Sequence, residues 1–435
     1  MRKYIIATGF VGLLLTQNAC REEYLNPSAA SEQQVVNSTS GLITLANGMQ
    51  FRYTVGREGA LYNAVAASGL TTRELRVLNA GNTDELLLEQ GYNSVQGNNA
   101  VIRNLWTSSQ LTRNIADIIL QNVDRVVQDP GTRSGLVAYA SIFKALSLGT
   151  LARFFQQAPI VTGTNAQFVN REQMLREAIR QLEAAATLVS ATPVGAGFTS
   201  QVVPGFDIPN TLQALIARYS LFVGDYDKAI AAAGRVNLTV RSFFSFDENS
   251  RNPVFEVAFS NRNVFEPTNA NLGLSGVLAP DPADRRIAFY TQTANTARNL
   301  GTGFYTANNA PVPVYLPGEM LLIRAEAYAR KGDLDNAITE LNRVLTKTTD
   351  AWGIGAGLPA YSGPRTQEAV LAEIYRNRLI ELAYMGFRLE DSRRFSRSGP
   401  GSTVPQASQE RNRNFLPYPQ TERFNNSSTP EDPTS

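Results

Sequence analysis

The 435-residue sequence contains no histidine and only one cysteine, Cys20. Without histidine, the chain can form neither a Ser-His-Asp or Cys-His nucleophile system nor a histidine-ligated zinc site, and it has no general base whose ordinary pKa lies near neutrality. A single cysteine cannot close an intramolecular disulfide. Any catalysis would therefore depend on carboxylates, Lys, Tyr or Ser.

The chain also lacks an excess of charge of either sign. It has 40 basic and 38 acidic residues, a net charge of +2. Arg2 and Lys3 account for this difference, because residues 1–19 contain no acidic residue. A balanced chain offers no overall basic face to nucleic acid, so we expect no nucleic-acid partner. The apolar content of 43% is that of an ordinary globular protein with a sizeable core.

The N-terminus has the layout of a secretory signal peptide. In "MRKYIIATGFVGLLLTQNAC", a basic pair precedes twelve mainly apolar residues, Tyr4 to Leu15, and the small Ala19 precedes Cys20. As a helix, the apolar run would extend only about 18 Å, which is short of a hydrocarbon core of roughly 30 Å. The layout therefore predicts a signal peptide over residues 1–19 and no membrane span.

The same segment resembles the lipobox of bacterial lipoproteins, in which Cys20 would become the first mature residue and carry acyl chains. Gln17 departs from the common pattern, which has Leu at that position. The following "REEY" resembles the acidic signal that sends such lipoproteins to the cell surface. The alternative is an ordinary signal peptide with an incidental cysteine. We predict a lipidated, flexible tether over residues 20–40, anchored by several acyl chains because one chain alone binds a membrane only marginally.

Beyond the tether, apolar residues recur at helical spacing. Residues 100–127, 135–155 and 171–189 each predict a long helix. An internal repeat follows, because residues 212–236 and 320–344 share the layout G-D-x-D-x-A-I.

Each repeat predicts a hairpin of two helices. Gly224 and Gly332 suit a helix C-cap that needs a positive φ, and Asp225 and Asp333 suit the N-cap of the next helix. The hairpins are of tetratricopeptide type, but they are farther apart in sequence than a tandem array allows. Other structure must therefore lie between them.

The segment between the hairpins is less helical. "NPVFEVAFS", 252–260, alternates like a short strand, and residues 261–313 are rich in Asn, Thr, Gly and Pro, which is typical of long loops. Residues 350–364 form another long loop, of the kind that often binds ligands. We predict a single domain over 41–425, with a loop-rich lobe over about 240–313, and a disordered tail over 426–435.

Four segments, in this order, resemble landmarks of the SusD/RagB family of Bacteroidetes outer-membrane lipoproteins. They are "NPVFEVAFS", "PGEMLLIRAEAYARKGDLDNAITELNRV" (317–344), "YRNRLIELAYMGFRLEDSRRF" (375–395) and "FLPYPQTE" (415–422). The resemblance implies a mainly α fold, with tetratricopeptide-like hairpins as a scaffold and an irregular lobe with a few short β-strands. It also implies no enzymatic activity. We expect no cofactor and assign no metal ligands, and whether a structural calcium is bound stays open.

The resemblance further implies a role in nutrient uptake. The protein would be held on the outer membrane by its lipid anchor, facing the cell exterior. There it would capture a glycan or peptide and deliver it to a SusC-like TonB-dependent transporter.

Candidate ligand residues lie in two loops. The segment 71–99 and the loops after the second hairpin supply the ligand surface in the family. The candidates here are Arg73, Glu74, Asn79, Asn82, Asp84, Trp352 and Tyr361. The other tryptophan, Trp106, falls at core spacing in a predicted helix, so we expect it to be buried.

Two other functions remain open at this point. One is a carboxylate-based glycan hydrolase, for which Glu390 and Asp391 are an adjacent acid pair. Adjacent residues on a helix do not face each other, so we expect a structural role for this pair. The other is a periplasmic tetratricopeptide-like scaffold that binds other proteins.

The role of Cys20 is testable by lipid labelling. Cells that produce the protein and are fed radiolabelled palmitate should label the native chain and not the Cys20→Ala variant, because acylation needs the thiol. Label retained by the variant would contradict the anchor.

Overall fold

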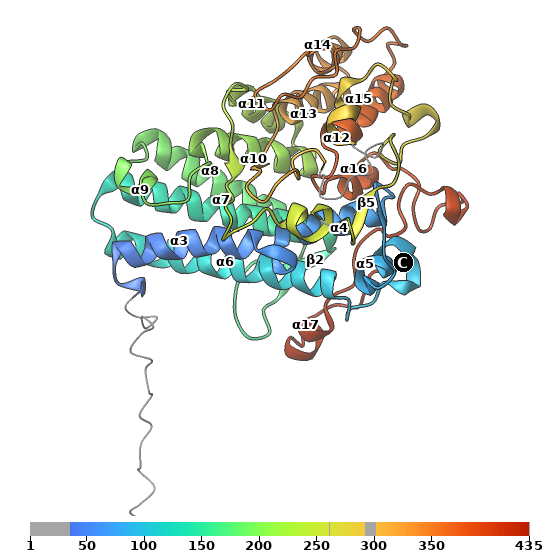
Figure 1. The fold of residues 1–435 in the computed structure, drawn as a ribbon. Coiled ribbons are helices and arrows are strands. Elements are labelled where there is room, and N and C mark those ends of the chain that lie inside the picture. Colours follow the sequence, from blue (N-terminus) through green and yellow to red (C-terminus); the bar gives the residue numbers. More distant parts are fainter. Residues whose placement is uncertain (1–34, 261, 292–301, 435) are drawn as a thin grey trace, which may run out of the picture.

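The long helices stack side by side in sequence order and form a helical scaffold (Figure 1). The computed structural model describes residues 35–260, 262–291 and 302–434. Cys20, the signal peptide and most of the predicted tether lie outside the described residues. The helices of the scaffold are α3 (Thr39–Thr54), α6 (Ala100–Val126), α7 (Pro130–Phe154), α8 (Arg171–Ala191), α10 (Ile208–Val223), α11 (Tyr226–Arg235), α13 (Pro317–Arg330), α14 (Leu334–Leu345) and α15 (Gln367–Glu381).

Helix α7 packs between α6 and α8. It begins at Asp129, whose side chain accepts a hydrogen bond from the Thr132 amide, and Pro130 occupies the first turn. By length and composition α7 could cross a membrane, but 89% of its most apolar window is buried inside the protein. It is the core helix of the scaffold, and the predicted helix over 135–155 is confirmed.

The two predicted hairpins are confirmed as α10–α11 and α13–α14. Gly224 and Gly332 have φ of 78° and 83°, a conformation that is strained for other residues. Asp225 and Asp333 accept hydrogen bonds from the amides three residues later, which caps α11 and α14. Helix α11 packs against α13, so the two hairpins are neighbours although a long insert separates them in sequence.

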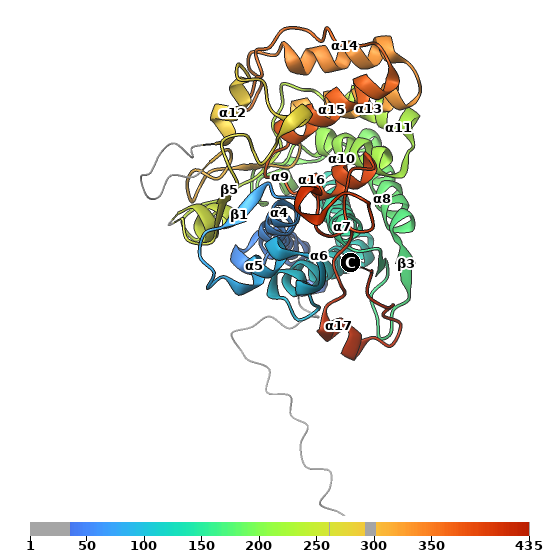
Figure 2. The ribbon, with the colours of Figure 1, turned by 90° about the vertical axis from the view of Figure 1, so that its right-hand side faces the viewer.

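Most of the shorter elements gather at one end of the scaffold and make up the irregular part of the molecule, whereas α9 (Ala196–Thr199) lies at the other end, beside the start of α7 (Figures 1 and 2). Short helices are α4 (Ala60–Thr71), α5 (Thr83–Gln90), α9 (Ala196–Thr199), α12 (Arg285–Tyr290), α16 (Arg388–Arg394) and α17 (Gln420–Asn425). The strands form three antiparallel pairs: β1 (Leu75–Val77) with β5 (Phe265–Pro267), β2 (Gln157–Pro159) with β3 (Phe168–Asn170), and β4 (Phe243–Phe244) with β6 (Val312–Pro313). The predicted mainly α fold with a few short strands is confirmed.

The strand predicted over 252–260 is wrong, because this segment is helical and contains a π-helix, Phe255–Phe259. The buried Asn252 starts it: its side-chain oxygen accepts hydrogen bonds from the Val254 and Phe255 amides. Its side-chain amide donates to the carbonyls of Phe304 and Ala310, which belong to a distant loop. A tertiary anchor therefore overrides the local alternation.

The C-terminal tail, predicted to be disordered, makes specific contacts over residues 426–434. Asn426 is 7% exposed, and its side-chain amide donates to the Ala166 carbonyl at 3.1 Å. Asp432 accepts a hydrogen bond from the Tyr418 amide at 2.9 Å and pairs with Arg423 at 2.8 Å. These contacts hold the tail against the "FLPYPQTE" segment.

A buried network of charges joins α13, α15 and α16. Glu326 of α13 accepts two hydrogen bonds from Arg394 of α16, both at 2.8 Å, and one from Arg330. Arg378 of α15 makes a two-pronged contact with Asp391 of α16 at 3.0 Å. The side chains of Glu326, Arg378 and Asp391 are at most 1% exposed. The segment that resembles the family's motif at 375–395 thus supplies much of the charge that holds three helices together.

We predict that Glu326→Ala lowers the free energy of unfolding by about 3–5 kcal/mol, because it leaves Arg394 and Arg330 without their shared carboxylate in a buried site. Urea unfolding followed by circular dichroism measures this change. A matched control is Glu172→Ala, which breaks an exposed pair with Arg176 and should cost about 1 kcal/mol or less. Equal effects of the two substitutions would contradict a stabilising role of burial and pairing at Glu326.

Candidate ligand-binding site

A polar hollow of about 460 Å³ opens in the irregular part of the molecule. Four segments that are distant in sequence supply its walls, and we call it the arginine hollow. Its lining residues are Thr72, Arg73, Gly273, Leu274, Ser275, Gly276, Val277, Leu278, Arg388, Arg397, Ala407, Ser408, Gln409 and Glu410. Three of its side chains are therefore arginines, and one is a carboxylate.

Arg73 spans one side of this hollow. It follows α4 and has a φ of 60°. Its guanidinium donates to the Gln406 carbonyl at 2.7 Å and to the Ala407 carbonyl. Gly273 lies directly against its backbone: a Cβ at Gly273, where φ is 70°, would be 2.1 Å from the Arg73 carbonyl oxygen. Only glycine allows this close approach, which brings the 273–278 loop to the Arg73 side of the hollow.

Arg388, at the start of α16, lies on another side. One of its Nη atoms donates to the Leu272 carbonyl at 2.6 Å. Neither Arg388 nor Arg73 has a carboxylate within ion-pair distance among the described residues. Arg397, by contrast, pairs with Glu410 at 2.6 Å, and Glu410 also accepts a hydrogen bond from Tyr375. The hollow therefore carries two guanidinium groups that form no ion pair, although the buried Glu74 carboxylate lies close enough to interact with the charge of Arg388.

Glu74, which the sequence predicts as a ligand contact, is buried. It is 1% exposed, and one of its carboxylate oxygens accepts a hydrogen bond from the Tyr384 amide at 3.0 Å. The other oxygen has no partner. Burial raises the pKa of Glu74, and the positive charge of Arg388 opposes this shift. Its burial corrects the expectation that this carboxylate faces a ligand.

Asn79, Asn82 and Asp84 shape local backbone instead of lining the hollow. Asn79 accepts from the Gly81 amide, and Asn82 accepts from Arg57 at 2.8 Å. Asp84 accepts from the Ala100 amide at 3.0 Å and thereby joins α5 to the start of α6. Their role in ligand binding stays a prediction.

Trp352 and Tyr361 lie apart from the arginine hollow. Trp352 is partly buried and makes edge contacts with Phe243 and Phe304, at ring separations of 6.0 and 5.5 Å. The exposed Arg241 stacks over its ring at 4.0 Å. Tyr361 packs near α14, where its amide donates to Asn342 and its hydroxyl to the Pro364 carbonyl. None of these contacts involves a residue that lines the hollow, and a role of Trp352 and Tyr361 in ligand binding stays a prediction.

Trp106 is buried as predicted, at 2% exposed. Its indole N–H donates to Glu422 at 3.1 Å, and its ring contacts Phe155, Phe168 and Tyr418. Trp106 therefore belongs to the core and not to a ligand surface.

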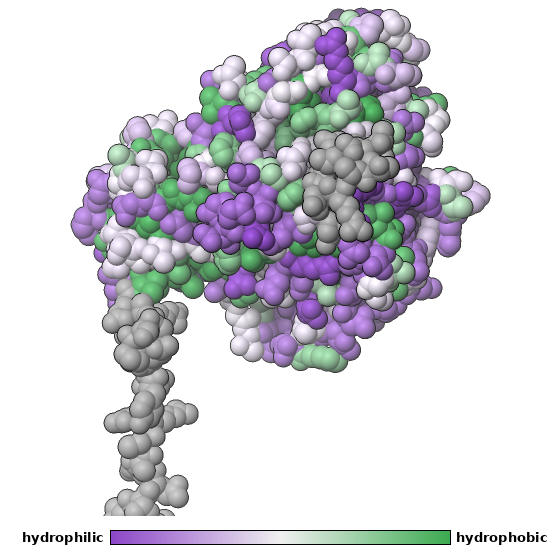
Figure 3. Space-filling view, viewed as in Figure 1, coloured by the Kyte–Doolittle hydropathy of each residue, from purple (hydrophilic) through white to green (hydrophobic). Residues whose placement is uncertain are grey.

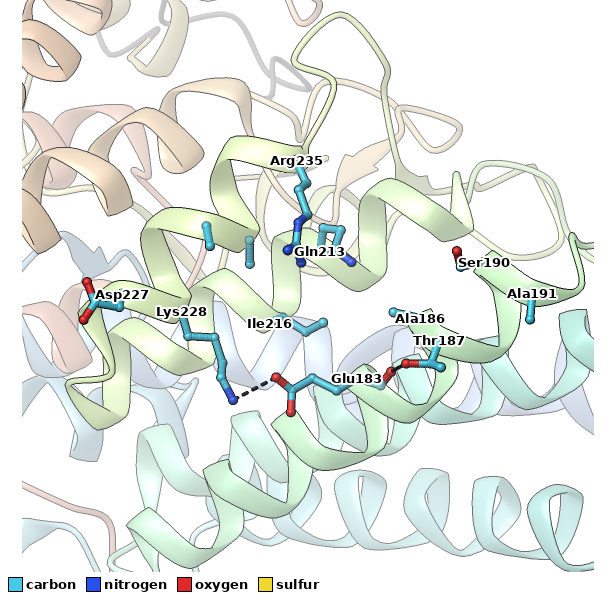
Figure 4. Close-up of a pocket in the computed structure, with 12 residues that line it drawn as sticks. Glu183, Ala186, Thr187, Ser190, Ala191, Gln213, Ile216, Asp227, Lys228 and Arg235 are labelled. Atoms are coloured by element: carbon cyan, nitrogen blue, oxygen red, sulfur yellow. Dashed lines mark hydrogen bonds and ion pairs between the residues drawn. The ribbon is translucent and has the colours of Figure 1, made fainter.

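A larger groove of about 1050 Å³ runs between α8, α10 and α11 (Figure 4). Figure 4 shows Arg235 and Gln213 extending over it, and an ion pair of 2.8 Å between Glu183 and Lys228 along its edge. On the face drawn in Figure 3, apolar residues emerge between the scaffold helices, and hydrophilic residues cover much of the remaining surface. The groove is a gap between packed helices, and it lacks the convergent loops of the arginine hollow.

The Glu390–Asp391 pair is buried in the ion network, as expected of a structural pair. Glu390 is bonded to Arg171 and, at 2.7 Å, to Arg393. Burial by itself would raise the pKa of Glu390, but the charges of Arg171, Arg393 and Arg394 lower it to about 2. A carboxyl group with this pKa is ionised near neutrality and cannot act as the general acid of a glycosidase.

Sequence reasoning missed most of the hollow. Arg388 was visible only as part of the 375–395 landmark, and nothing marked the 273–278 and 407–410 loops as neighbours. The glycine-rich "NLGLSG" at 271–276 was the one local signal, because positive φ at Gly273 and Gly276 permits the tight loop.

Comparison with known proteins shows which proteins this chain resembles. Residues 240–433 match the model of the SusD family. No curated protein matches the sequence. Among solved structures, a SusD superfamily protein from Bacteroides thetaiotaomicron VPI-5482 has 16% identity and a TM-score of 0.69, covering 91% of this chain and 100% of the other.

A SusD-like carbohydrate binding protein from Bacteroides vulgatus ATCC 8482 has 15% identity and a TM-score of 0.69, covering 90% of this chain and 97% of the other. A SusD superfamily protein from Bacteroides fragilis has 16% identity and the same TM-score, covering 91% and 100%. These likenesses establish the fold. Together with the family match, they confirm the predicted resemblance to the SusD/RagB family.

The lowered carboxyl pKa values predict a loss of stability in acid. The Arg394, Arg378 and Arg330 charges lower the pKa of Glu326 to about 2 against the opposing effect of burial, and Glu390 has a similar value. Because the folded pKa lies below the ordinary value of 4.5, the stabilisation is complete above pH 4.5 and is lost as the pH falls towards 2. Urea unfolding at pH 7, 4.5 and 3 should show a steep decrease below 4.5, and unchanged stability at pH 3 would contradict the lowered values.

Proposed function

We propose that this chain is a surface-exposed lipoprotein that captures a nutrient and delivers it to a SusC-like TonB-dependent transporter in the outer membrane. The observation that carries the proposal is the match of residues 240–433 to the SusD family. The fold is shared with a SusD-like carbohydrate binding protein, which supports an oligosaccharide as nutrient, with a peptide as the alternative.

The arginine hollow is the proposed nutrient site. Its walls come from four parts of the chain, in the irregular part of the molecule. Arg73 and Arg388 each have N–H groups there that are not used in hydrogen bonds to the chain. Arg73 and Arg388 can donate to ligand oxygens, and the exposed hydroxyls of Ser275 and Ser408 have no partner among the described residues. Trp352, beneath Arg241, and Tyr361 are a separate candidate surface for sugar stacking.

The proposed place of action rests on the N-terminal segment. A signal peptide over 1–19 and acylation of Cys20 would attach the mature chain to the outer membrane, and the acidic "REEY" would direct it to the outer face. We infer that the chain binds without transforming its ligand, because both carboxylates of its candidate acid pair are buried and held by arginines of the ion network.

A binding screen of the purified mature chain against glycan and peptide arrays tests this function. We expect at least one oligosaccharide to bind and to be recovered at its original length. Steady hydrolysis of that oligosaccharide would overturn the proposal in favour of a glycan hydrolase.

Location and partnership are tested in cells. Protease added to intact cells should digest the protein, and solubilised membranes should yield a complex with a TonB-dependent transporter. The Cys20→Ala variant is the matched control, which should be lost from the membrane fraction. Resistance to protease in intact cells, with digestion after lysis, would favour the periplasmic scaffold instead.

A further inference from the structure

Arg73 and Arg388 differ from the arginines of the ion network, although other buried arginines such as Arg153 and Arg413 also have no ion pair among the described residues. Arg378, Arg393 and Arg394 each contact at least one carboxylate of the ion network. Arg73 and Arg388 hold only backbone carbonyls. A guanidinium has five donors, so both keep N–H groups for another acceptor.

The one carboxylate that lines the hollow does not neutralise them. Both oxygens of Glu410 are engaged, one by Arg397 at 2.6 Å and the other by Tyr375 at 2.7 Å. Glu74, behind Arg388, is enclosed by protein and is outside ion-pair distance. The charges that line the hollow therefore sum to a surplus of two positive charges, on Arg73 and Arg388.

The rest of the lining suits a polyol better than a peptide. Ser275 and Ser408 present hydroxyls, and the loops around them present backbone groups. None of the residues that line the hollow belongs to a β-strand, so it offers no strand edge along which an extended peptide could pair. Nor does it contain an aromatic side chain on which a neutral sugar ring could stack.

We propose that the arginine hollow binds an acidic oligosaccharide, whose carboxylate or sulfate groups are held by Arg73 and Arg388. This inference rests on the proposed function and specifies its nutrient. Guanidinium groups match the oxygens of such anions in charge and in geometry, and the charge-assisted hydrogen bonds are stronger than those to neutral hydroxyls. The anion would provide the acceptor that the two arginines lack in the chain itself.

Calorimetric titration of the mature chain with charged and uncharged forms of the same sugars tests the proposal. The panel contains uronic acid tetrasaccharides, their carboxyl-reduced neutral counterparts, and sulfated tetrasaccharides with their desulfated forms. We expect at least one acidic member to bind at least tenfold more tightly than its neutral counterpart, and its affinity to fall with added salt. The uronic and sulfated arms identify which anion is recognised.

Variants locate the binding in the hollow. Arg73→Gln and Arg388→Gln should each weaken the acidic ligand about tenfold or more, and Arg73→Lys should retain part of the affinity because it keeps the charge. Arg235→Gln is the matched control: it removes one exposed, unpaired arginine from the scaffold groove and should leave binding unchanged. Thermal unfolding of each variant establishes that it is folded. The comparison of charged with uncharged sugars on the native chain does not depend on any variant.

Three results would overturn the inference. The first is failure of every acidic sugar to bind, and the second is equal affinity for charged and neutral forms. The third is binding of an acidic peptide such as tetraglutamate in place of the sugars. Tight binding of a neutral oligosaccharide alone would overturn the acidic class and leave the proposed nutrient-capture function intact.

Discussion

The buried ion network of α13, α15 and α16 is the constraint on which the arrangement of the irregular part depends. Each charge in it would be costly if left alone in the interior, and each is held by opposite charge from another helix. Glu326 of α13 receives Arg394 of α16, and Asp391 of α16 receives Arg378 of α15. Such contacts specify one relative position of the three helices, since a shift of any helix would leave a charge without its partner.

The position of α16 in turn places Arg388. This residue opens α16, and just before it Gly386 has a φ of 76° and lies so close to α4 that a Cβ would be 2.9 Å from the Ala64 carbonyl oxygen. The preceding Phe387 is covered by the guanidinium groups of Arg153 and Arg218, both from the scaffold. These contacts hold the backbone of Arg388 in place. Its hydrogen bond to the Leu272 carbonyl also holds the loop that contains Leu272.

The sequence predicted best what is determined locally. Helical periodicity and the caps at Gly224, Asp225, Gly332 and Asp333 act over a few residues, and both hairpins followed from them. The segment at 252–260 was misread because Asn252 bonds to carbonyls more than fifty residues away, which no local pattern reports. The same reasoning explains the tail, whose order depends on distant partners such as Ala166.

The candidate site shows this limit most clearly. Arg73 was identifiable from its segment, but its partners at Gln406 and Ala407 lie over 330 residues later in the chain. The overall composition did not predict the site either, because a chain with balanced charge can still place two arginines without an ion pair in one hollow. The arginines of the neighbouring network have carboxylate partners, whereas Arg73 and Arg388 donate only to backbone carbonyls. Arginines without an ion pair in the described part of the chain also occur at Arg153 and Arg413, so the case for a site here depends on two such arginines lining the same hollow.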